Sequence, residues 1–326
     1  MAPRKFRKAM IKTGLYRIEQ LSSLRNTGGF FGGTRRASIT LYDQLTSIRD
    51  GEKWGEQVLS LFSDGRGAYK RTYGRRFDEF DASAIRRIAE AFEAERALVI
   101  HDVGVSDART ACDFFHSAAA RFPRLTYYAS DFEPTLSILR LGNIKVAMNQ
   151  NGQILEIVLP PFVFNTIKPE DFRLYPINYL FFQIARKICV PRVLAAWRDG
   201  TIQPSSLSLF CPEATELARR DNRFRLLDHD LLESAPFPVP VDVVRAMNVL
   251  NASYFSEREL AQIAARIFHS LVDGGLLIVG SNEEAGSQVR GAIYRKAKVG
   301  FVELRRSAAV HDAHHMIVGY APQAAA

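Results

Sequence analysis

The chain has 326 residues, of which 47% are hydrophobic and 24% are charged, and its formal net charge is +8. This is the composition of a globular protein with room for two average domains, and it excludes a largely disordered chain. The three cysteines lie far apart, with no histidine at metal-ligand spacing, so the sequence indicates neither a disulfide framework nor a zinc site and favours a reducing, cytoplasmic compartment.

The N-terminal segment, residues 1–18, contains six basic residues and no acidic one, interleaved with apolar side chains. Such a segment can lie on an anionic membrane surface, act as a targeting presequence or be a solvated helix or arm. It lacks the long apolar core of a secretory signal, and no run of about 18 uncharged apolar residues could span a bilayer. A peripheral contact with an anionic membrane is therefore one expectation, and the basic charge also leaves nucleic acid as a partner to consider.

A helical N-terminal region is expected over residues 1–94, because residues 38–95 follow a helical pattern. Asp81 or Ser83 is expected to cap the last helix of this region. Two strand–turn–helix cycles follow. The first has a strand over 97–100 with a helix over 108–121, and the second has a strand over 125–129 with a helix through 136–139.

Residues 143–206 interrupt this alternation and are predicted to be an insertion. Residues 153–164 favour one or two strands broken by Pro160-Pro161, and residues 175–197 favour an unusually apolar helix. The insertion is interpreted as a small subdomain with its own core, with a substrate lid or a membrane-facing surface as alternatives.

The strand–helix alternation then resumes, with helices expected over 211–220 and 257–271 and strands over 224–227, 241–244 and 276–279. Two final strands, 301–304 and 316–320, are expected to form an antiparallel hairpin at the sheet edge. His311, His314 and His315 gather near the turn between them, and a polar turn is favoured over a metal site there. The sequence thus predicts an α/β fold, with a mostly parallel sheet whose last strand is antiparallel, a helical N-terminal region and an inserted subdomain.

Acidic residues follow three of the predicted strands, where ligands bind in doubly wound sheets. Asp102 can engage a cationic amino group, and Gly104 lets the backbone approach a ligand closely. Asp131 can accept hydrogen bonds from ribose hydroxyls, and Asp230 from an exocyclic amine. For each acid alone, a helix cap or a turn residue is the favoured interpretation, so the prediction rests on their coincidence.

The first of these loops resembles the first motif of the class I methyltransferases, an acid followed by alternating glycines. Asp102 and Gly104 match it, whereas Ser106 and Ala108 replace the other two glycines.

A longer segment, residues 241–284, resembles the chemotaxis receptor methyltransferases, although no segment of the chain resembles their receptor-docking subdomain. The matching positions are Asp242, Asn248, Val249, Leu250, the aromatic pair Tyr254-Phe255, Gly275, Leu277, Gly280 and Glu283.

The resemblance implies a Rossmann-like methyltransferase domain over residues 95–326 that binds S-adenosylmethionine and no metal. The expected cofactor contacts are Asp102, Gly104, Val105, Ser106, Asp131, Phe132, Asp230, Leu231, Met247 and Asn248. The expected substrate contacts are Tyr175, Asn178, Tyr179 and Tyr254.

The expected reaction is an SN2 methyl transfer, which chiefly needs a nucleophile held in line with the methyl group, so no general base is assigned. The apolar insertion favours a small, hydrophobic or lipid-like acceptor. A non-catalytic protein that binds S-adenosylmethionine and a nucleic-acid methyltransferase are the alternatives. Nucleic acid is the less favoured partner, because the chain has no Asn-Pro-Pro-Tyr-type motif and no cysteine nucleophile at a suitable strand end.

Overall fold

The computed structural model describes residues 11–25, 36–47, 51–70, 72, 74–170, 172–282 and 288–322. The chain divides into two compact units, and each is built from two separate segments. Unit 1 comprises residues 1–71 and 135–209, and unit 2 comprises residues 72–134 and 210–326. Within the described residues, no helix combines the length and hydropathy that a bilayer span requires.

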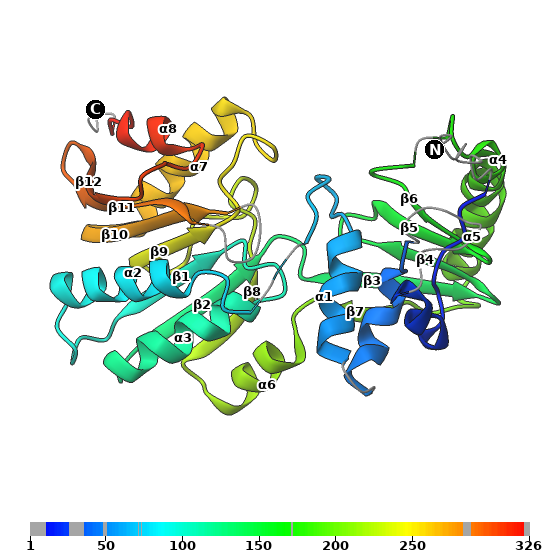
Figure 1. The fold of residues 1–326 in the computed structure, drawn as a ribbon, viewed down its shortest axis with the longest axis horizontal. Coiled ribbons are helices and arrows are strands. Elements are labelled where there is room, and N and C mark those ends of the chain that lie inside the picture. Colours follow the sequence, from blue (N-terminus) through cyan, green and yellow to red (C-terminus); the bar gives the residue numbers. More distant parts are fainter. Residues whose placement is uncertain are drawn as a thin grey trace, which may run out of the picture. The chain divides into compact units, whose positions relative to one another are not determined.

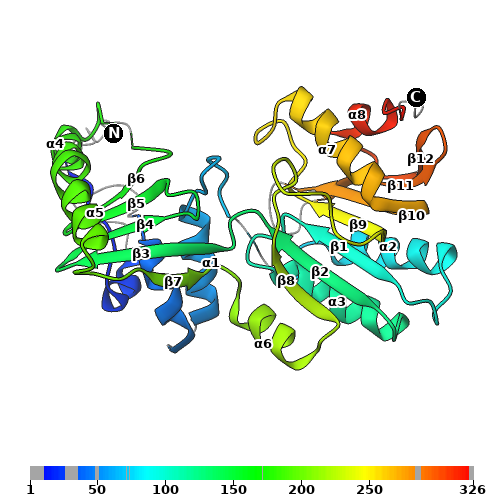
Figure 2. The same ribbon diagram turned by 180° about the vertical axis from the view of Figure 1, so that it is seen from behind.

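Unit 2 is built on a seven-stranded sheet with the order β12-β11-β10-β9-β1-β2-β8 (Figures 1 and 2). The five strands from β10 to β8 are parallel, whereas β11 is antiparallel to both of its neighbours. The strands are β1 (Val99–Val103), β2 (Thr126–Asp131), β8 (Phe224–Asp228), β9 (Val241–Met247), β10 (Leu271–Ser281), β11 (Arg290–Ala297) and β12 (Gly300–Arg306).

Helices cover both faces of this sheet, because neighbouring strand residues point into two different cores. Val243 and Ile278 pack against one helix group, and Val244 and Leu277 pack against the other. The first group is α2 (Asp78–Ala91), α3 (Arg109–Arg121) and α6 (Pro212–Arg220), and the second is α7 (Glu257–Ser270) and α8 (His314–Val318). The fold is therefore a doubly wound, Rossmann-like sheet, as predicted.

Unit 1 has an antiparallel sheet of order β6-β5-β4-β3-β7, which also lies between two helical layers. Leu136 and Ile138 face the first layer, and Leu139 faces the second. The strands are β3 (Thr135–Leu141), β4 (Ile144–Met148), β5 (Ile154–Leu159), β6 (Phe162–Asn165) and β7 (Ser205–Ser208). The first layer has the 3-10 helices η1 (Ile18–Arg25) and η2 (Ile39–Ser47) with α1 (Gly51–Leu61), and the second has α4 (Pro176–Ile184), a π-helical turn η3 (Ala185–Cys189) and α5 (Val190–Arg198).

Unit 1 changes the predicted domain boundaries. Its second segment begins at Thr135, because residues 136–139 are strand and not helix, so the insertion starts before residue 143 and ends after residue 206. The helical region expected over residues 1–94 is divided between the units: α1 belongs to unit 1, whereas α2 belongs to unit 2. The error arose because Leu136, Ile138 and Leu139 also fit a helical spacing, although the fold buries them on the two faces of a strand.

The C-terminal prediction is also corrected. The edge hairpin pairs β11 with β12, and residues 314–318 form the short helix α8, where a strand over 316–320 was expected. His311 and His314 do not form a polar turn, since both are buried and contact the Tyr294 hydroxyl, at 2.8 and 2.7 Å. Burial lowers the pKa of His311 to about 3, so this imidazole is neutral at pH 7.

Candidate cofactor-binding site

The loops that follow β1, β2, β8 and β9 meet at one edge of the unit 2 sheet, because these strands are parallel neighbours. Two backbone bonds join the loops: Val105 N donates to the carbonyl of Ser130, and His229 N donates to that of Asp131. The predicted cofactor residues Gly104, Val105, Ser106, Asp131, Phe132, Asp230, Leu231, Met247 and Asn248 lie in these loops or end the strands before them. The fold therefore brings this predicted set to a single edge.

The loop after β1 has a left-handed backbone conformation at three positions, two of which are not glycine. Gly104, Ser106 and Ala108 have φ values of 67°, 59° and 64°. A Cβ atom on Gly104 would come within 2.6 Å of Val249 Cγ2, so only glycine fits there. Serine and alanine each lose roughly 1 kcal/mol in a left-handed conformation. The loop thus has positive φ at all three positions that are glycine in the motif it resembles, at a cost in stability.

Asp131 fixes the shape of this loop. Its Oδ2 accepts the backbone N–H of Ser106 at 2.8 Å, and its Oδ1 accepts that of Glu133 at 3.1 Å. A carboxylate can accept further hydrogen bonds at both oxygens. Next to it, the Ser106 hydroxyl is buried without a hydrogen-bond partner. An unpartnered hydroxyl on a strained loop beside a carboxylate fits a polar ligand such as the ribose and amino acid of S-adenosylmethionine.

Asp102, in contrast, is not available to a cofactor amine, which corrects its predicted role. It is only 1% exposed and points to the α3 side of the sheet. Its Oδ2 accepts hydrogen bonds from Arg245 Nη1 at 2.8 Å and from the Tyr127 hydroxyl at 2.6 Å. The guanidinium thus takes the place that a cationic ligand was expected to fill.

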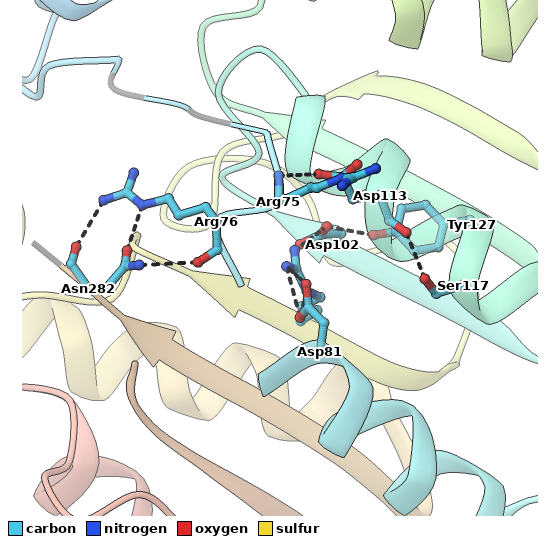
Figure 3. Close-up of polar contacts among 9 residues, drawn as sticks. Arg75, Arg76, Asp81, Asp102, Asp113, Ser117, Tyr127 and Asn282 are labelled. Carbon is cyan, nitrogen blue, oxygen red and sulfur yellow. Dashed lines mark hydrogen bonds and ion pairs between the residues drawn. The ribbon is translucent and has the colours of Figure 1, made fainter. Parts of the chain in front are cut away.

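Arg245 also binds Asp81, so one guanidinium lies between two buried carboxylates. Its Nη2 is 2.9 Å from Asp81 Oδ2, and its guanidinium lies 4.7 Å from the centre of the Phe114 ring. Figure 3 shows Asp81, Asp102 and Tyr127 around this point. Burial raises the pKa of Asp81 to about 6 against the opposing effect of Arg245, and burial also raises the pKa of Asp102.

Asp81 therefore pairs with Arg245 and does not cap α2, which begins at Asp78 after Phe77. Sequence analysis missed Arg245. The available signal was a cation inside the apolar strand VDVVRAM, because a charge in a buried strand needs a buried counter-charge.

Asn248, predicted to contact the cofactor, ties the end of β9 to the end of β10. It has a φ of 58°, and its Oδ1 accepts the backbone N–H of Asn282 at 2.8 Å. Arg76 continues the contact: its Nε donates to Asn282 Oδ1 at 2.6 Å, as Figure 3 shows. The Asn248 side chain thus has the turn-fixing role, and Arg76 is a polar residue at this edge that sequence analysis did not identify. Glu283, next in the chain, lies outside the described residues.

The loop after β8 is shaped by Asp230 itself, whose Oδ1 accepts the backbone N–H of Leu232 at 2.8 Å. Leu231 lines a cavity of about 400 Å³ on the α7 side of the sheet, together with His101, His229 and Phe237. The His101 ring stacks on Phe237, with ring centres 3.9 Å apart. Burial lowers the pKa of His101 to about 3 and also lowers that of His229, so these two imidazoles are neutral in a cavity whose lining is mostly apolar but includes Arg266.

The predicted substrate residues fall in both units. Tyr254 belongs to unit 2 and packs against the α7 core. Tyr175, Asn178 and Tyr179 belong to unit 1. The Asn178 side chain is buried and binds the backbone of Lys12, accepting its N–H at 2.9 Å and donating to its carbonyl at 2.7 Å. Asn178 is therefore a structural residue, which corrects its predicted contact with substrate.

The part of the chain that the structure describes contains no group of three or more histidine, cysteine, aspartate or glutamate side chains that could hold a metal ion.

Comparison with known proteins identifies part of unit 2. Residues 218–299 match the family model described as CheR methyltransferase, SAM binding domain, and this range contains the segment 241–284 singled out from the sequence. No curated protein matches the chain.

The chain is similar to several solved methyltransferase structures at low identity. CalS10, an amino pentose methyltransferase from Micromonospora echinaspora, is 15% identical over 68% of this chain and 64% of its own, with a TM-score of 0.30. TrmN from Thermus thermophilus is 12% identical over 66% and 48%, with a TM-score of 0.34. The N-methyltransferase NodS from Bradyrhizobium japonicum WM9, in complex with S-adenosyl-L-homocysteine, is 11% identical over 69% and 72%, with a TM-score of 0.33. The chain thus spans less than two thirds of the length of CalS10 and of TrmN.

The strand order of unit 2 gives a Rossmann-like sheet, and the part of it that matches a family model is similar to the class I S-adenosylmethionine-dependent methyltransferases. Within that class, residues 218–299 are similar to the CheR type, and S-adenosylmethionine is the cofactor of such a domain.

Proposed function

We propose that the chain is an S-adenosylmethionine-dependent methyltransferase that acts on a small, hydrophobic or lipid-like acceptor. The observation that carries the proposal is the loop from Gly104 to Ala108, which keeps three left-handed backbone positions beside Asp131 although two of them are not glycine. Conformational strain of this kind persists where the surrounding structure enforces it, and it concentrates at ligand sites.

When bound, S-adenosylmethionine supplies a methyl group activated by a sulfonium. The chain has to hold the cofactor, exclude water and align the acceptor, and proximity and orientation supply much of the rate in such a transfer. Residues Gly104 to Ala108 let the backbone lie close to the ligand, and Asp131 presents oxygens to its hydroxyls. The apolar cavity beside His229 and Leu231 supports an acceptor of small size and low polarity.

A second candidate, a protein that binds S-adenosylmethionine without transferring its methyl group, is favoured by one observation. Asp102, the acid of the first motif, is fully engaged by Arg245 and Tyr127. A bound amino acid moiety would then need another carboxylate or backbone carbonyls, and its methyl group could be held out of line with an acceptor.

Calorimetry with S-adenosylmethionine and with S-adenosylhomocysteine, followed by transfer of a labelled methyl group to a panel of hydrophobic acceptors, separates the two candidates. Binding with transfer supports the enzyme, and binding without transfer supports the second candidate. If neither compound binds, both candidate functions are contradicted.

Asp131→Ala is expected to weaken S-adenosylmethionine binding at least tenfold and to abolish transfer, because it removes the acceptor for the Ser106 N–H together with the proposed ribose contact. Asp273→Ala is the control, since this residue of unit 2 has a 97% exposed side chain. Equal affinity of the Asp131→Ala and Asp273→Ala variants would exclude the proposed location of the cofactor.

A further inference from the structure

Exposed apolar side chains concentrate on one segment of unit 1. Nine large hydrophobic residues are exposed among the described residues, and five of them lie within residues 174–197. They are Leu174, Tyr179, Leu180, Ile188 and Trp197, with Leu180 the most exposed of the five at 58%. Single exposed apolar residues are ordinary on a protein surface, but a cluster on one helical segment marks an interaction site.

The core of unit 1 does not account for these residues. The side of α4–α5 that faces the sheet is formed by other residues, among them Phe182, Ala185 and Val193, which pack against the strands. The segment is therefore apolar on its inner side and again on its outer side. A helix that only covers a sheet needs a single apolar stripe, so the second one requires another explanation.

The charges on the same segment all have one sign. Arg186, Lys187, Arg192 and Arg198 are exposed, and no acidic residue occurs anywhere from Pro176 to Arg198. Within the described residues, no carboxylate forms an ion pair with any of these four cations. The outer side of the helix thus combines aliphatic and aromatic side chains with uncompensated positive charge.

The basic N-terminal segment joins the chain beside this helix. Lys12 is held by Asn178 of α4, and its Nζ lies 5.9 Å from the centre of the Tyr175 ring. Four further basic residues precede Lys12 in the sequence: Arg4, Lys5, Arg7 and Lys8. Within this segment, Leu15 is fully buried in the core of unit 1. The sequence-based hypothesis that residues 1–18 form one solvated basic arm therefore does not hold for Leu15.

We infer that the outer face of α4–α5 binds an anionic membrane surface. Leu180, Ile188 and Trp197 would enter the boundary between headgroups and acyl chains, while the cations contact lipid phosphates. A nucleic acid would use the cations but not the aliphatic side chains, and a neutral apolar protein groove would leave the cations unpaired. An anionic bilayer surface satisfies both groups, and tryptophan favours that interface. The inference does not depend on methyltransferase activity.

The test is flotation of the full chain with phosphatidylcholine vesicles that either contain or lack phosphatidylglycerol. The wild-type chain is expected to float with the anionic vesicles. The double variants Leu180→Ser/Ile188→Ser and Arg186→Gln/Lys187→Gln should each reduce the bound fraction at least tenfold. The matched control is Val299→Ser/Val302→Ser, which removes exposed apolar residues from unit 2 and should float as the wild type does.

Three results would overturn the inference: a wild-type chain that fails to float, α4–α5 variants that float like the wild type, or equal losses in these variants and in the control. Light scattering without vesicles gives a fourth criterion. If the wild type is a dimer that Leu180→Ser/Ile188→Ser makes monomeric, the face is a contact between copies of the chain. Circular dichroism and tryptophan fluorescence of every variant check that both units remain folded, since both tryptophans lie in unit 1.

Discussion

The two units solve the same packing problem with different buried charges. Each places a sheet between two helical layers, but unit 2 encloses the ion cluster of Arg245, Asp81 and Asp102, whereas unit 1 encloses Glu156 with neutral donors. Glu156 accepts hydrogen bonds from the Ser38 hydroxyl at 2.6 Å and from the backbone of Ile39 at 3.1 Å. Removal of Arg245 would leave two carboxylates of unit 2 without their counter-charge, whereas Glu156, whose hydrogen-bond donors are neutral, makes the stability of unit 1 depend on pH.

The chain contains a probe that separates the units. Its two tryptophans are Trp54 in α1 and Trp197 in α5, and both belong to unit 1. Tryptophan fluorescence therefore follows unfolding of unit 1, while far-ultraviolet circular dichroism follows both units. A transition seen by circular dichroism but not by fluorescence belongs to unit 2.

The largest expected effect is that of Arg245→Met, which leaves two carboxylates buried without their cation. It should lower the free energy of unfolding of unit 2 by about 3–5 kcal/mol, with the fluorescence transition of unit 1 unchanged. Urea unfolding followed by both probes measures this difference. Arg305→Met, at an exposed position on β12, is the control and should change stability by less than about 0.5 kcal/mol.

Adding Asp81→Asn to Arg245→Met should recover part of the loss, since it removes one of the two uncompensated charges. If Arg245→Met alone lowers the free energy of unfolding of unit 2 by less than about 1 kcal/mol, the ion pairs of the cluster do not stabilise the unit as proposed.

An intermediate effect is expected at Glu156 in unit 1. Burial raises its pKa from 4.5 to about 7, so the folded state binds a proton that the unfolded state has already released between these values. The free energy of unfolding of unit 1 should therefore fall by about 3 kcal/mol as the pH rises from about 4.5 to about 7, and then level off. Glu156→Gln should remove this dependence in fluorescence-detected urea unfolding. Glu52→Gln, at an exposed position in α1, should leave it intact, and a wild-type unit 1 that is equally stable across this range would contradict the argument.

The smallest effect tests the strained loop of unit 2. Ser106→Gly should raise the stability of unit 2 by about 1 kcal/mol, because glycine adopts positive φ without penalty. Ala108→Gly should raise it less, because this substitution also removes a fully buried methyl group. Ala120→Gly, at an exposed position in α3, should lower it by about 1 kcal/mol. The opposite signs, measured by urea unfolding, distinguish relief of backbone strain from a general response to glycine. Equal destabilisation by all three substitutions would show that the loop is unstrained.

Local pattern was sufficient for much of unit 2. The apolar runs before Asp102 and Asp131 and the helical spacing from Glu257 onwards predicted β1, β2 and α7, because burial on a known face leaves its period in the sequence. β3 was predicted as a helix and β11 was not identified, since short apolar runs fit more than one period. The carboxyl-edge position of Asp131 and Asp230 could be predicted from strand order alone, whereas the partners of their side chains could not.

The sequence by itself predicted the strand–helix alternation of unit 2, the loops at the carboxyl edge of its sheet and the altered glycine motif, because these depend on residues close together in the chain. Only the tertiary structure decided the fate of Asp102. Its partner Arg245 is 143 positions away and Asp81 approaches from a third segment, so no local pattern records the cluster. The same holds for unit 1, whose two halves are separated by more than sixty residues and are joined by contacts such as that between Lys12 and Asn178. Long-range pairing of charges and assembly of discontinuous segments arise only when the chain is folded.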